Sequence, residues 1–369
     1  MFEELMNRYP WDMVEDKIYS STDRDFKAVL YSDFKSPEDF FPMFSPAADR
    51  YLEEMAILSN RNTIMRFGKT IQLYAPLYIS NECVNSCVYC GFNIKNKIKR
   101  LTLSPDLVVK ESEILYQKGF RHILLVTGEH RGAVPVSMLC EIAKRLHNKF
   151  SSISIEVYPM DEEEYSSMVR SGIDGLALYQ ETYNRKRYSD IHPAGKKRDF
   201  SWRLAAVERG GAAGFRKIGI GALLGISDWR VDGFFLALHA SYLMKRYWKS
   251  HIQISFPRLR GSEAGYVPPI PVSDKDLTHL ICAMRIIHHD LGLVMSTRES
   301  ASYRNNIMPL GITMMSAGSK TEPGGYSKIN NADGQFRIED TRPPDRVVDM
   351  IRQKGFDPVW KDWDRDFLA

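Results

Sequence analysis

Three of the five cysteines lie within eight positions of one another, in the stretch "ECVNSCVYCGF". Cys83, Cys87 and Cys90 follow the spacing C-x3-C-x2-C. Thiolates are soft ligands that suit iron–sulfur clusters, zinc or copper(I). A structural zinc site needs four protein ligands, and the nearest further candidate is His122. We therefore favour a four-iron cluster with one iron left free of protein ligands over three incidental loop cysteines.

Composition narrows the class of protein. The chain has 369 residues, 44% hydrophobic and 26% charged, with a net charge of +4. This is ordinary for one large or two medium globular domains, and it gives no reason to expect nucleic acid or a membrane surface as a partner. The acidic N-terminus does not resemble a secretory signal. An odd, clustered set of cysteines indicates a reducing, cytoplasmic compartment, with the isolated Cys140 and Cys282 in the core.

Further polar residues follow or interrupt apolar runs that we expect to be strands. In "VTGEH", Thr127, Gly128 and Glu129 offer close backbone approach and a carboxylate that can accept from an ammonium group. Glu156 lies within the apolar "ISIEVYP", where burial is costly without a partner, so we expect a ligand contact. Gly221, in "IGIGALLG", suits either a ligand or tight strand packing.

A second set lies later in the chain. Arg298, in "STRES", could grip a carboxylate or pair with Glu299, and Ser316 would point to the same end of the fold. The basic stretch 95–100, "KNKIKR", is expected to be a solvated loop, with docking of an acidic flavodoxin as the alternative. The remaining candidates for ligand contacts are Gln180, Glu181 and Tyr183 in "YQETY" and Arg258 and Arg260 in "FPRLR".

Short apolar runs alternate with amphipathic stretches, which predicts a parallel sheet covered by helices. The span from Ile71 to Ser319 has about the usual length of a (β/α)8 barrel, and an open doubly wound sheet is the alternative. The first of the eight expected strands begins at Ile71, and the other seven cover 122–128, 153–159, 174–180, 217–225, 252–257, 292–297 and 310–318.

The helical patterns carry recognisable start and stop signals. We expect helices from Ser45, from Ser104 to Gly119, from the acidic run at 161 to Gly172, and from about 274 to Gly292. The predicted organisation is an N-terminal helical extension (1–66), the barrel (67–320) and a C-terminal segment (321–369) that packs on the barrel and includes a short helix at 343–354.

C-x3-C-x2-C with an aromatic residue, here Tyr89, before the last cysteine resembles the signature of the radical S-adenosylmethionine (SAM) superfamily. The resemblance implies a [4Fe–4S] cluster on Cys83, Cys87 and Cys90, with SAM on the fourth iron. It also implies that Thr127, Gly128 and Glu129 contact the methionyl amine of SAM, and that Tyr89, Glu156, Gly221 and Arg258 belong to the cofactor site.

The motifs "RFGKTIQLYAPLYISNEC", "LLVTGEH", "YQETY", "SFPRLR", "STRES" and "KTEPGGY" together resemble the aromatic-amino-acid lyase branch, most closely the tyrosine lyases of thiamine biosynthesis. This implies cleavage of L-tyrosine to 2-iminoacetate and p-cresol, with substrate held by Arg298, Ser316, Gln180, Glu181 and Tyr183. It also implies thiazole synthase and a flavodoxin- or ferredoxin-type reductant as partners.

Three alternatives remain open. The enzyme could act on tryptophan or a deazaflavin precursor, or it could be a hydrogenase-maturation-type lyase, although the lack of cysteines after Cys282 argues against a second cluster. The third alternative is not an enzyme but a non-catalytic module that binds an iron–sulfur cluster or zinc.

Overall fold

Eight parallel strands form a closed barrel in the computed structural model, which describes residues 1–34, 36–260, 265–328 and 332–361. Each strand pairs with the next along the chain, and β1 pairs with both β2 and β8, so the sheet closes. The predicted barrel is confirmed and the open sheet is excluded. The strands are β1 (Thr70–Ser80), β2 (His122–Thr127), β3 (Ser152–Glu156), β4 (Gly175–Ala177), β5 (Lys217–Gly221), β6 (His251–Ser255), β7 (Gly292–Met295) and β8 (Met314–Ser316).

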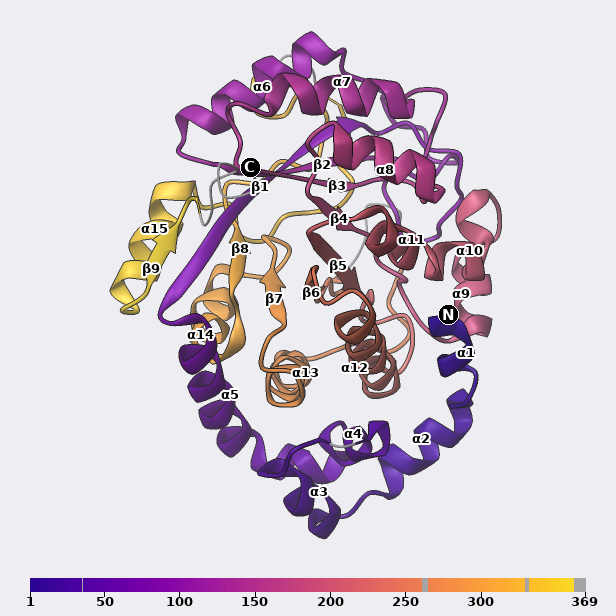
Figure 1. Ribbon diagram of the computed structural model, residues 1–369, viewed down its shortest axis with the longest axis vertical. Helices are drawn as coiled ribbons and strands as arrows, with labels where there is room; N and C mark the ends of the chain where they lie inside the picture. Colours follow the sequence, from indigo (N-terminus) through magenta and orange to yellow (C-terminus); the bar gives the residue numbers. More distant parts are fainter. Residues whose placement is uncertain (35, 261–264, 329–331, 362–369) are drawn as a thin grey trace.

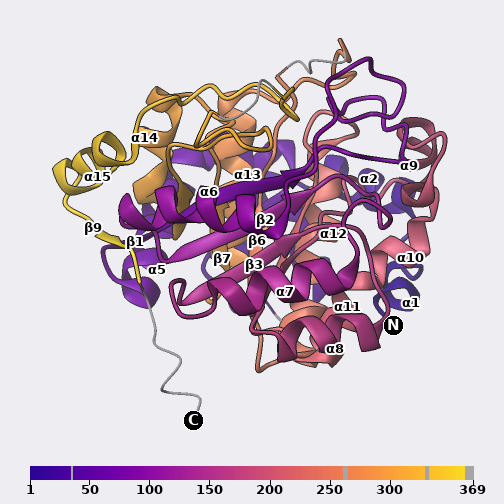
Figure 2. The ribbon, with the colours of Figure 1, turned by 90° about the horizontal axis from the view of Figure 1, so that it is seen from above.

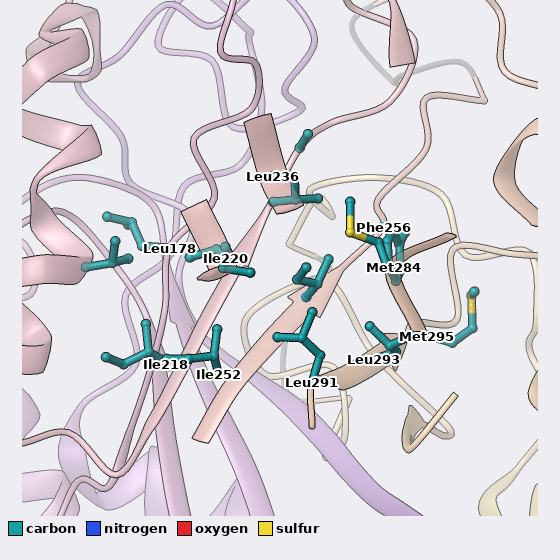
Figure 3. Close-up of a cluster of buried hydrophobic side chains, with 14 of the residues drawn as sticks. Leu178, Ile218, Ile220, Leu236, Ile252, Phe256, Met284, Leu291, Leu293 and Met295 are labelled. Atoms are coloured by element: carbon teal, nitrogen blue, oxygen red, sulfur yellow. The ribbon is translucent and has the colours of Figure 1, made fainter. Parts of the chain in front are cut away.

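Side chains alternate between the two faces of the barrel wall, as the two-residue period of a strand requires. In β1, Leu73, Ala75 and Leu77 are buried beneath the outer helices, whereas Tyr74 and Tyr78 line the interior. Figure 3 shows the same apolar layer further round, where side chains of β5, β6 and β7 pack with Leu236 and Met284 of two outer helices. Apolar side chains therefore pack on the outer face of the barrel wall, and polar residues can occupy the interior at the carboxyl ends of the strands.

Helices cover the outside of the barrel (Figure 1). The predicted cap at Ser104 is confirmed, because its side chain accepts from the amide of Leu107. Asp161, in the predicted acidic run, caps α8 by accepting from the amide of Glu164. One predicted stop is wrong, because α13 ends at Ile287 and Gly292 instead begins β7. The covering helices are α6 (Pro105–Gln117), α7 (Val136–Leu146), α8 (Glu162–Arg170), α9 (Arg185–Ile191), α10 (Phe200–Leu204), α11 (Ala206–Ala213), α12 (Trp229–Arg246), α13 (Asp274–Ile287) and α14 (Ala301–Gly311).

The N-terminal helices form an outer arc along α12, α13 and α14 (Figure 1). Phe2 stacks on His239 of α12, with ring centroids 3.9 Å apart. Ser45 does not act as the predicted cap: its hydroxyl donates to the carbonyl of Pro42, and a 3-10 helix (Pro46–Tyr51) comes before α5. The arc comprises α1 (Phe2–Met6), α2 (Trp11–Ser20), α3 (Asp23–Leu30), α4 (Phe40–Met43) and α5 (Leu52–Phe67).

The C-terminal part returns to the start of the barrel. The predicted short helix is α15 (Pro344–Gln353), and a strand that we did not predict, β9 (Asp357–Val359), pairs in parallel with the first residues of β1. Figure 2 shows α15 and β9 on the opposite side of the molecule from α9 and α10. The aromatic end of the predicted C-terminal segment, from residue 362, lies outside the described residues. None of the described helices is both long and apolar enough to cross a membrane.

Candidate active site

A cavity lies at the carboxyl ends of the strands, where active sites of such barrels are found. Its walls come from the loop after β1, the ends of the other strands, and residues 332–340, which we call the C-terminal strap. The structure brings most of the predicted site residues together here. They are Cys83, Cys87, Tyr89, Cys90, Thr127, Gly128, Glu129, Glu156, Glu181, Arg298 and Ser316.

The cysteine loop is held in shape by its own polar side chains. The Asn93 amide donates to the carbonyl of Cys87 at 2.9 Å, and the Asn96 amide donates to that of Gly91 at 2.9 Å. Arg100 donates to the carbonyls of Asn81, Phe92 and Asn93. Arg100 is therefore a structural residue of this loop, which corrects the expectation of a wholly solvated 95–100 stretch.

The three thiols suit a cluster. Burial raises the pKa of Cys90 to about 11 and that of Cys87 further, so without metal both thiols stay protonated and metal binding must release protons. Among the described residues, no three His, Cys, Asp or Glu side chains are grouped as ligands of a single metal ion. The loop that carries the thiols is tightly packed against residue 335, because a Cβ at Gly91 would lie 2.6 Å from the carbonyl oxygen of Gln335. Three soft donors on one tightly packed loop fit a [4Fe–4S] cluster better than zinc.

The end of β2 packs directly against this loop. A Cβ at Gly128 would lie 2.2 Å from the carbonyl oxygen of Glu82, so only glycine fits without a shift. Glu129 accepts from the Asn85 amide and from Arg203, each at 2.8 Å. The carboxylate is thereby fixed at the cavity wall beside the cysteines, as a group that recognises an ammonium must be.

Glu181 occupies a rarer backbone conformation, with φ of 73°. Its carboxylate accepts from Lys197 at 2.5 Å, and Arg203 lies 3.7 Å away. Burial raises the pKa of Glu181, but the charges of Lys197 and Arg203 lower it more, so the net shift is downward. Left-handed backbone at a non-glycine residue costs about 1–3 kcal/mol and persists mainly where function demands it.

Arg298 faces the cavity with its charge unpaired. Its guanidinium lies 3.7 Å from the centre of the Phe336 ring, and no ion pair or side-chain hydrogen bond to it is seen among the described residues. The expected alternative partner, Glu299, pairs with Arg258 and Arg260 instead. Burial lowers the pKa of Arg298. An unpaired, partly buried guanidinium stacked on a ring is suited to a carboxylate ligand.

Ser316 lies at the end of the neighbouring strand. Its hydroxyl accepts from the amide of Thr297 at 3.0 Å. This bond joins the ends of β7 and β8 directly beside Arg298. The two residues predicted to hold an amino-acid end are thus on adjacent strand ends.

The C-terminal strap connects the two ends of the cavity. Gln335 accepts from the Tyr78 hydroxyl at 2.7 Å, and its amide nitrogen lies 3.9 Å from the sulfur of Cys90. The next residue, Phe336, stacks on Arg298. One short segment therefore contacts both the cysteine loop and the arginine across the cavity.

Some predicted site residues lie elsewhere. Arg258 is 3% exposed and is saturated by Glu299, Asp274 and the Val272 carbonyl. Its predicted role at the cofactor site is therefore wrong, because its donors are used to anchor the β6–α13 connection. Gly221 does not line the cavity: a Cβ there would lie 2.8 Å from the Ser255 carbonyl, which supports the strand-packing alternative.

The predicted substrate contacts Gln180 and Tyr183 also point away from the cavity. Gln180 donates to the carbonyl of Phe200, and the Tyr183 hydroxyl bonds to Nδ1 of His239 in the outer core. In the "YQETY" stretch only Tyr179 and Glu181 line the cavity. Side-chain alternation accounts for Gln180, which lies between two cavity residues. It does not account for Tyr183, which is two residues after Glu181: the left-handed backbone at Glu181 breaks the strand pattern there.

Sequence reasoning missed Asn85, Lys197, Arg203, Gln335 and Phe336. Lys197 and Arg203 lie in a stretch rich in basic residues, and nothing in that pattern separates two buried cations from their exposed neighbours. Gln335 and Phe336 follow a loop-like run, so only the path of the strap places them at the cavity.

Comparison with known proteins agrees with this geometry. The radical SAM superfamily model matches residues 77–238, and the biotin and thiamin synthesis associated domain matches residues 255–357. The 2-iminoacetate synthase of Escherichia coli (strain K12) is 42% identical over 98% of this chain and 97% of its own length, and that of Salmonella typhimurium (strain LT2) gives the same values.

A crystal structure of HydG, a maturase of the [FeFe]-hydrogenase, superposes with a TM-score of 0.89 at 28% identity, over 95% of this chain and 79% of that one. HydG from Carboxydothermus hydrogenoformans gives 0.83 at 30% identity, over 97% and 82%.

Proposed function

We propose that this chain, which belongs to the 2-iminoacetate synthase family of radical SAM enzymes, holds its [4Fe–4S] cluster on Cys83, Cys87 and Cys90. It is a radical SAM lyase that cleaves the Cα–Cβ bond of L-tyrosine to 2-iminoacetate and p-cresol, with 5′-deoxyadenosine and methionine, for thiamine thiazole biosynthesis. The observation that carries the assignment is that a match over nearly the full length to 2-iminoacetate synthases coincides with a cavity lined by the three cysteines, Glu129 and Arg298. The cluster and SAM supply a deoxyadenosyl radical when bound.

On the SAM side, the protein's part is recognition. We assign Thr127, Gly128 and Glu129 to the methionyl amine, because Gly128 permits backbone approach and Glu129 is fixed beside the cysteines. Tyr89 lines the same wall and is held by its bond to His192 at 2.9 Å. Glu181, with Lys197 and Arg203, offers further fixed charge to the same ligand. These contacts fix one reactive carbon in place rather than alter its chemistry.

On the substrate side, Arg298 and Ser316 hold the amino-acid end of tyrosine. The unpaired guanidinium of Arg298 can bind the carboxylate in a bidentate manner, and Ser316 can bond the amine or carboxylate from the adjacent strand. Fixing both groups presents one N–H to the radical, so positioning selects the hydrogen that is removed.

Two partners follow from the chemistry. The imine product hydrolyses in water, so we propose that thiazole synthase receives it. The cluster needs an external electron donor, and Lys95, Lys97 and Lys99 are exposed on the cysteine loop, which fits an acidic flavodoxin or ferredoxin. Electron transfer should then slow with added salt; a salt dependence equal to that of a variant with these lysines neutralised would contradict the docking site.

We also propose the division into an N-terminal helical extension (1–66), a catalytic barrel (67–320) and a C-terminal segment (321–369) that packs on the barrel. We propose that the protein works in the reducing cytoplasm.

Anaerobic reconstitution with tyrosine, SAM and dithionite, followed by mass spectrometry, tests the function. We expect p-cresol and 5′-deoxyadenosine in the wild type. Cys87→Ser should hold fewer than four irons and cleave no SAM, whereas Cys140→Ser, on the outer helix α7, should match the wild type. SAM cleavage without p-cresol would contradict the tyrosine assignment.

A further inference from the structure

Glu156 is the last residue of β3 and points into the cavity, in register with Val126 of β2. In a closed barrel of eight strands, β3 lies across the interior from β7. Arg298 is the third residue after the end of β7 at Met295. The carboxylate of Glu156 and the guanidinium of Arg298 therefore face the cavity from opposite walls.

The Glu156 carboxylate also differs from the other carboxylates that line the cavity. Glu129 is paired with Asn85 and Arg203, and Glu181 with Lys197. Within the described ranges, no hydrogen bond or ion pair reaches the carboxylate of Glu156. A partly buried carboxylate without a protein partner is costly, so it is suited to accept a proton or hydrogen bond from a ligand.

Burial is the main reason why the pKa of Glu156 lies near neutral pH. Burial and the charge of Glu181 raise its pKa to about 7, while Lys197, Arg203 and Arg298 act in the opposite direction. The remaining titratable groups that interact with it are the phenols of Tyr74, Tyr78 and Tyr179, whose pKa values all lie above the ordinary value, mainly through burial. A general base works best when its pKa lies near the working pH.

Part of the wall between the two charges is apolar, alongside the hydroxyls of Tyr74, Tyr78 and Ser316. Pro76, Leu124, Val126 and Val294 line the cavity between strands β1, β2 and β7. A molecule with a carboxylate at one end, a ring in the middle and a hydroxyl at the other matches this order of surfaces. Tyrosine bound through its carboxylate at Arg298 would direct its phenol toward β3.

We propose that Glu156 is a catalytic residue that accepts the phenolic proton of tyrosine. The inference rests on the proposed function and deepens it. The phenolic O–H bond breaks and a carboxyl O–H bond forms, so the negative charge moves from Glu156 to the phenolate oxygen, and no electron is gained or lost in this step. The phenolate then stabilises the benzylic fragment that leaves when the Cα–Cβ bond breaks.

The two pKa values give the equilibrium constant for the proton transfer from tyrosine to Glu156. The phenol of tyrosine has an ordinary pKa of about 10, so transfer to a carboxylate with a pKa of about 7 is unfavourable by about a thousandfold. A substrate with a more acidic phenol should need the base less. The proposal therefore places Glu156 in the substrate site, whereas the sequence alone suggested that it contacts SAM.

The test uses Glu156→Gln in the reconstituted holoenzyme, with tyrosine and with ring-fluorinated tyrosines of progressively lower phenol pKa. We expect p-cresol formation from tyrosine to fall by about 100-fold or more, and the deficit to shrink steadily as the phenol of the substrate becomes more acidic. Glu156→Asp should recover part of the activity. Glu162→Gln, exposed on α8, is the matched control and should behave as the wild type.

Two readouts separate the possible failures. Iron content and the change that SAM produces in the EPR signal of the reduced cluster should be unaltered in Glu156→Gln, and loss of either would overturn the proposal in favour of a SAM or structural contact. An equal deficit with every fluorinated tyrosine would also overturn it. Failure of the proposed function itself would appear in the wild type, as SAM cleavage without a cresol.

Discussion

Arg304 of α14 and Asp340 of the C-terminal strap form an ion pair in which both side chains are completely buried. Arg304 also donates to the carbonyl of Ser316, and the amide of Asp340 donates to the carbonyl of Thr297 at 3.1 Å. The pair thus joins the strap to the ends of β7 and β8, where Ser316 and Arg298 lie. The substrate wall therefore depends on a contact between α14 and the C-terminal strap, whose two paired residues are 36 positions apart in sequence.

Asp340→Asn should destabilise the protein strongly. Removing one partner of a buried ion pair leaves an uncompensated charge and typically costs about 3–5 kcal/mol. We expect a lower midpoint of urea unfolding and a raised KM for tyrosine. Glu339→Gln is the control, since its contact with the exposed Arg337 spans 3.8 Å and such pairs contribute at most about 1 kcal/mol. Equal effects of the two substitutions would show that the buried pair has no special role.

Arg298→Lys should weaken tyrosine binding while preserving charge. Lysine keeps the cation but loses the two-pronged donor geometry and the stacking on Phe336. We expect the KM for tyrosine to rise about 10- to 100-fold. We also expect more 5′-deoxyadenosine than p-cresol, because SAM is still cleaved when tyrosine is not held. Steady-state assays of p-cresol and 5′-deoxyadenosine measure both quantities. An unchanged KM would remove Arg298 from the substrate site.

His239 should make the protein less stable in mild acid. Burial lowers its pKa to about 3 in the folded chain, against about 6.5 when unfolded. Between these pH values the unfolded chain binds a proton that the folded chain does not, so stability falls as pH drops below 6.5. At pH 5.5 the penalty is about 1.4 kcal/mol relative to high pH.

His239→Phe, which can keep the stack with Phe2, should remove that part of the pH dependence. Urea unfolding at pH 7.5 and 5.5 measures the difference. His192 and His288, whose pKa values burial also lowers, keep a residual slope in the variant. The exposed His147→Gln should show the wild-type slope, and a slope in His239→Phe equal to the wild type would refute the assignment.

Gly128→Ala should disrupt the junction between β2 and the cysteine loop. The new methyl group would lie 2.2 Å from the carbonyl oxygen of Glu82, a backbone atom that cannot move alone. We expect reduced iron content after reconstitution and loss of the SAM-dependent EPR change. Gly132→Ala is the control, because its nearest neighbour is the side chain of His130 at 3.1 Å. Normal cluster loading in Gly128→Ala would mean that the loop tolerates displacement.

The sequence alone determined the features that depend on local order. The period of the apolar runs predicted all eight strands, since a buried strand needs a continuous run and a covering helix needs an amphipathic one. The spacing of Cys83, Cys87 and Cys90 pointed to a cluster, because three soft donors on one loop suffice to define it.

Only the tertiary structure decided which polar residues meet. Gln180 and Tyr183 lie in the same pentapeptide as Glu181, yet Gln180 bonds to the carbonyl of Phe200 and Tyr183 to His239 of α12, away from the cavity. The sequence predicted Arg258 as a ligand contact, but in the structure it forms an ion pair with Glu299. Because Glu299 pairs with Arg258, it is not available as a partner for Arg298. Barrel closure, which pairs β1 with β8, sets Glu156 across from Arg298. Such pairings depend on long-range packing, and local sequence carries no record of what lies on the opposite wall.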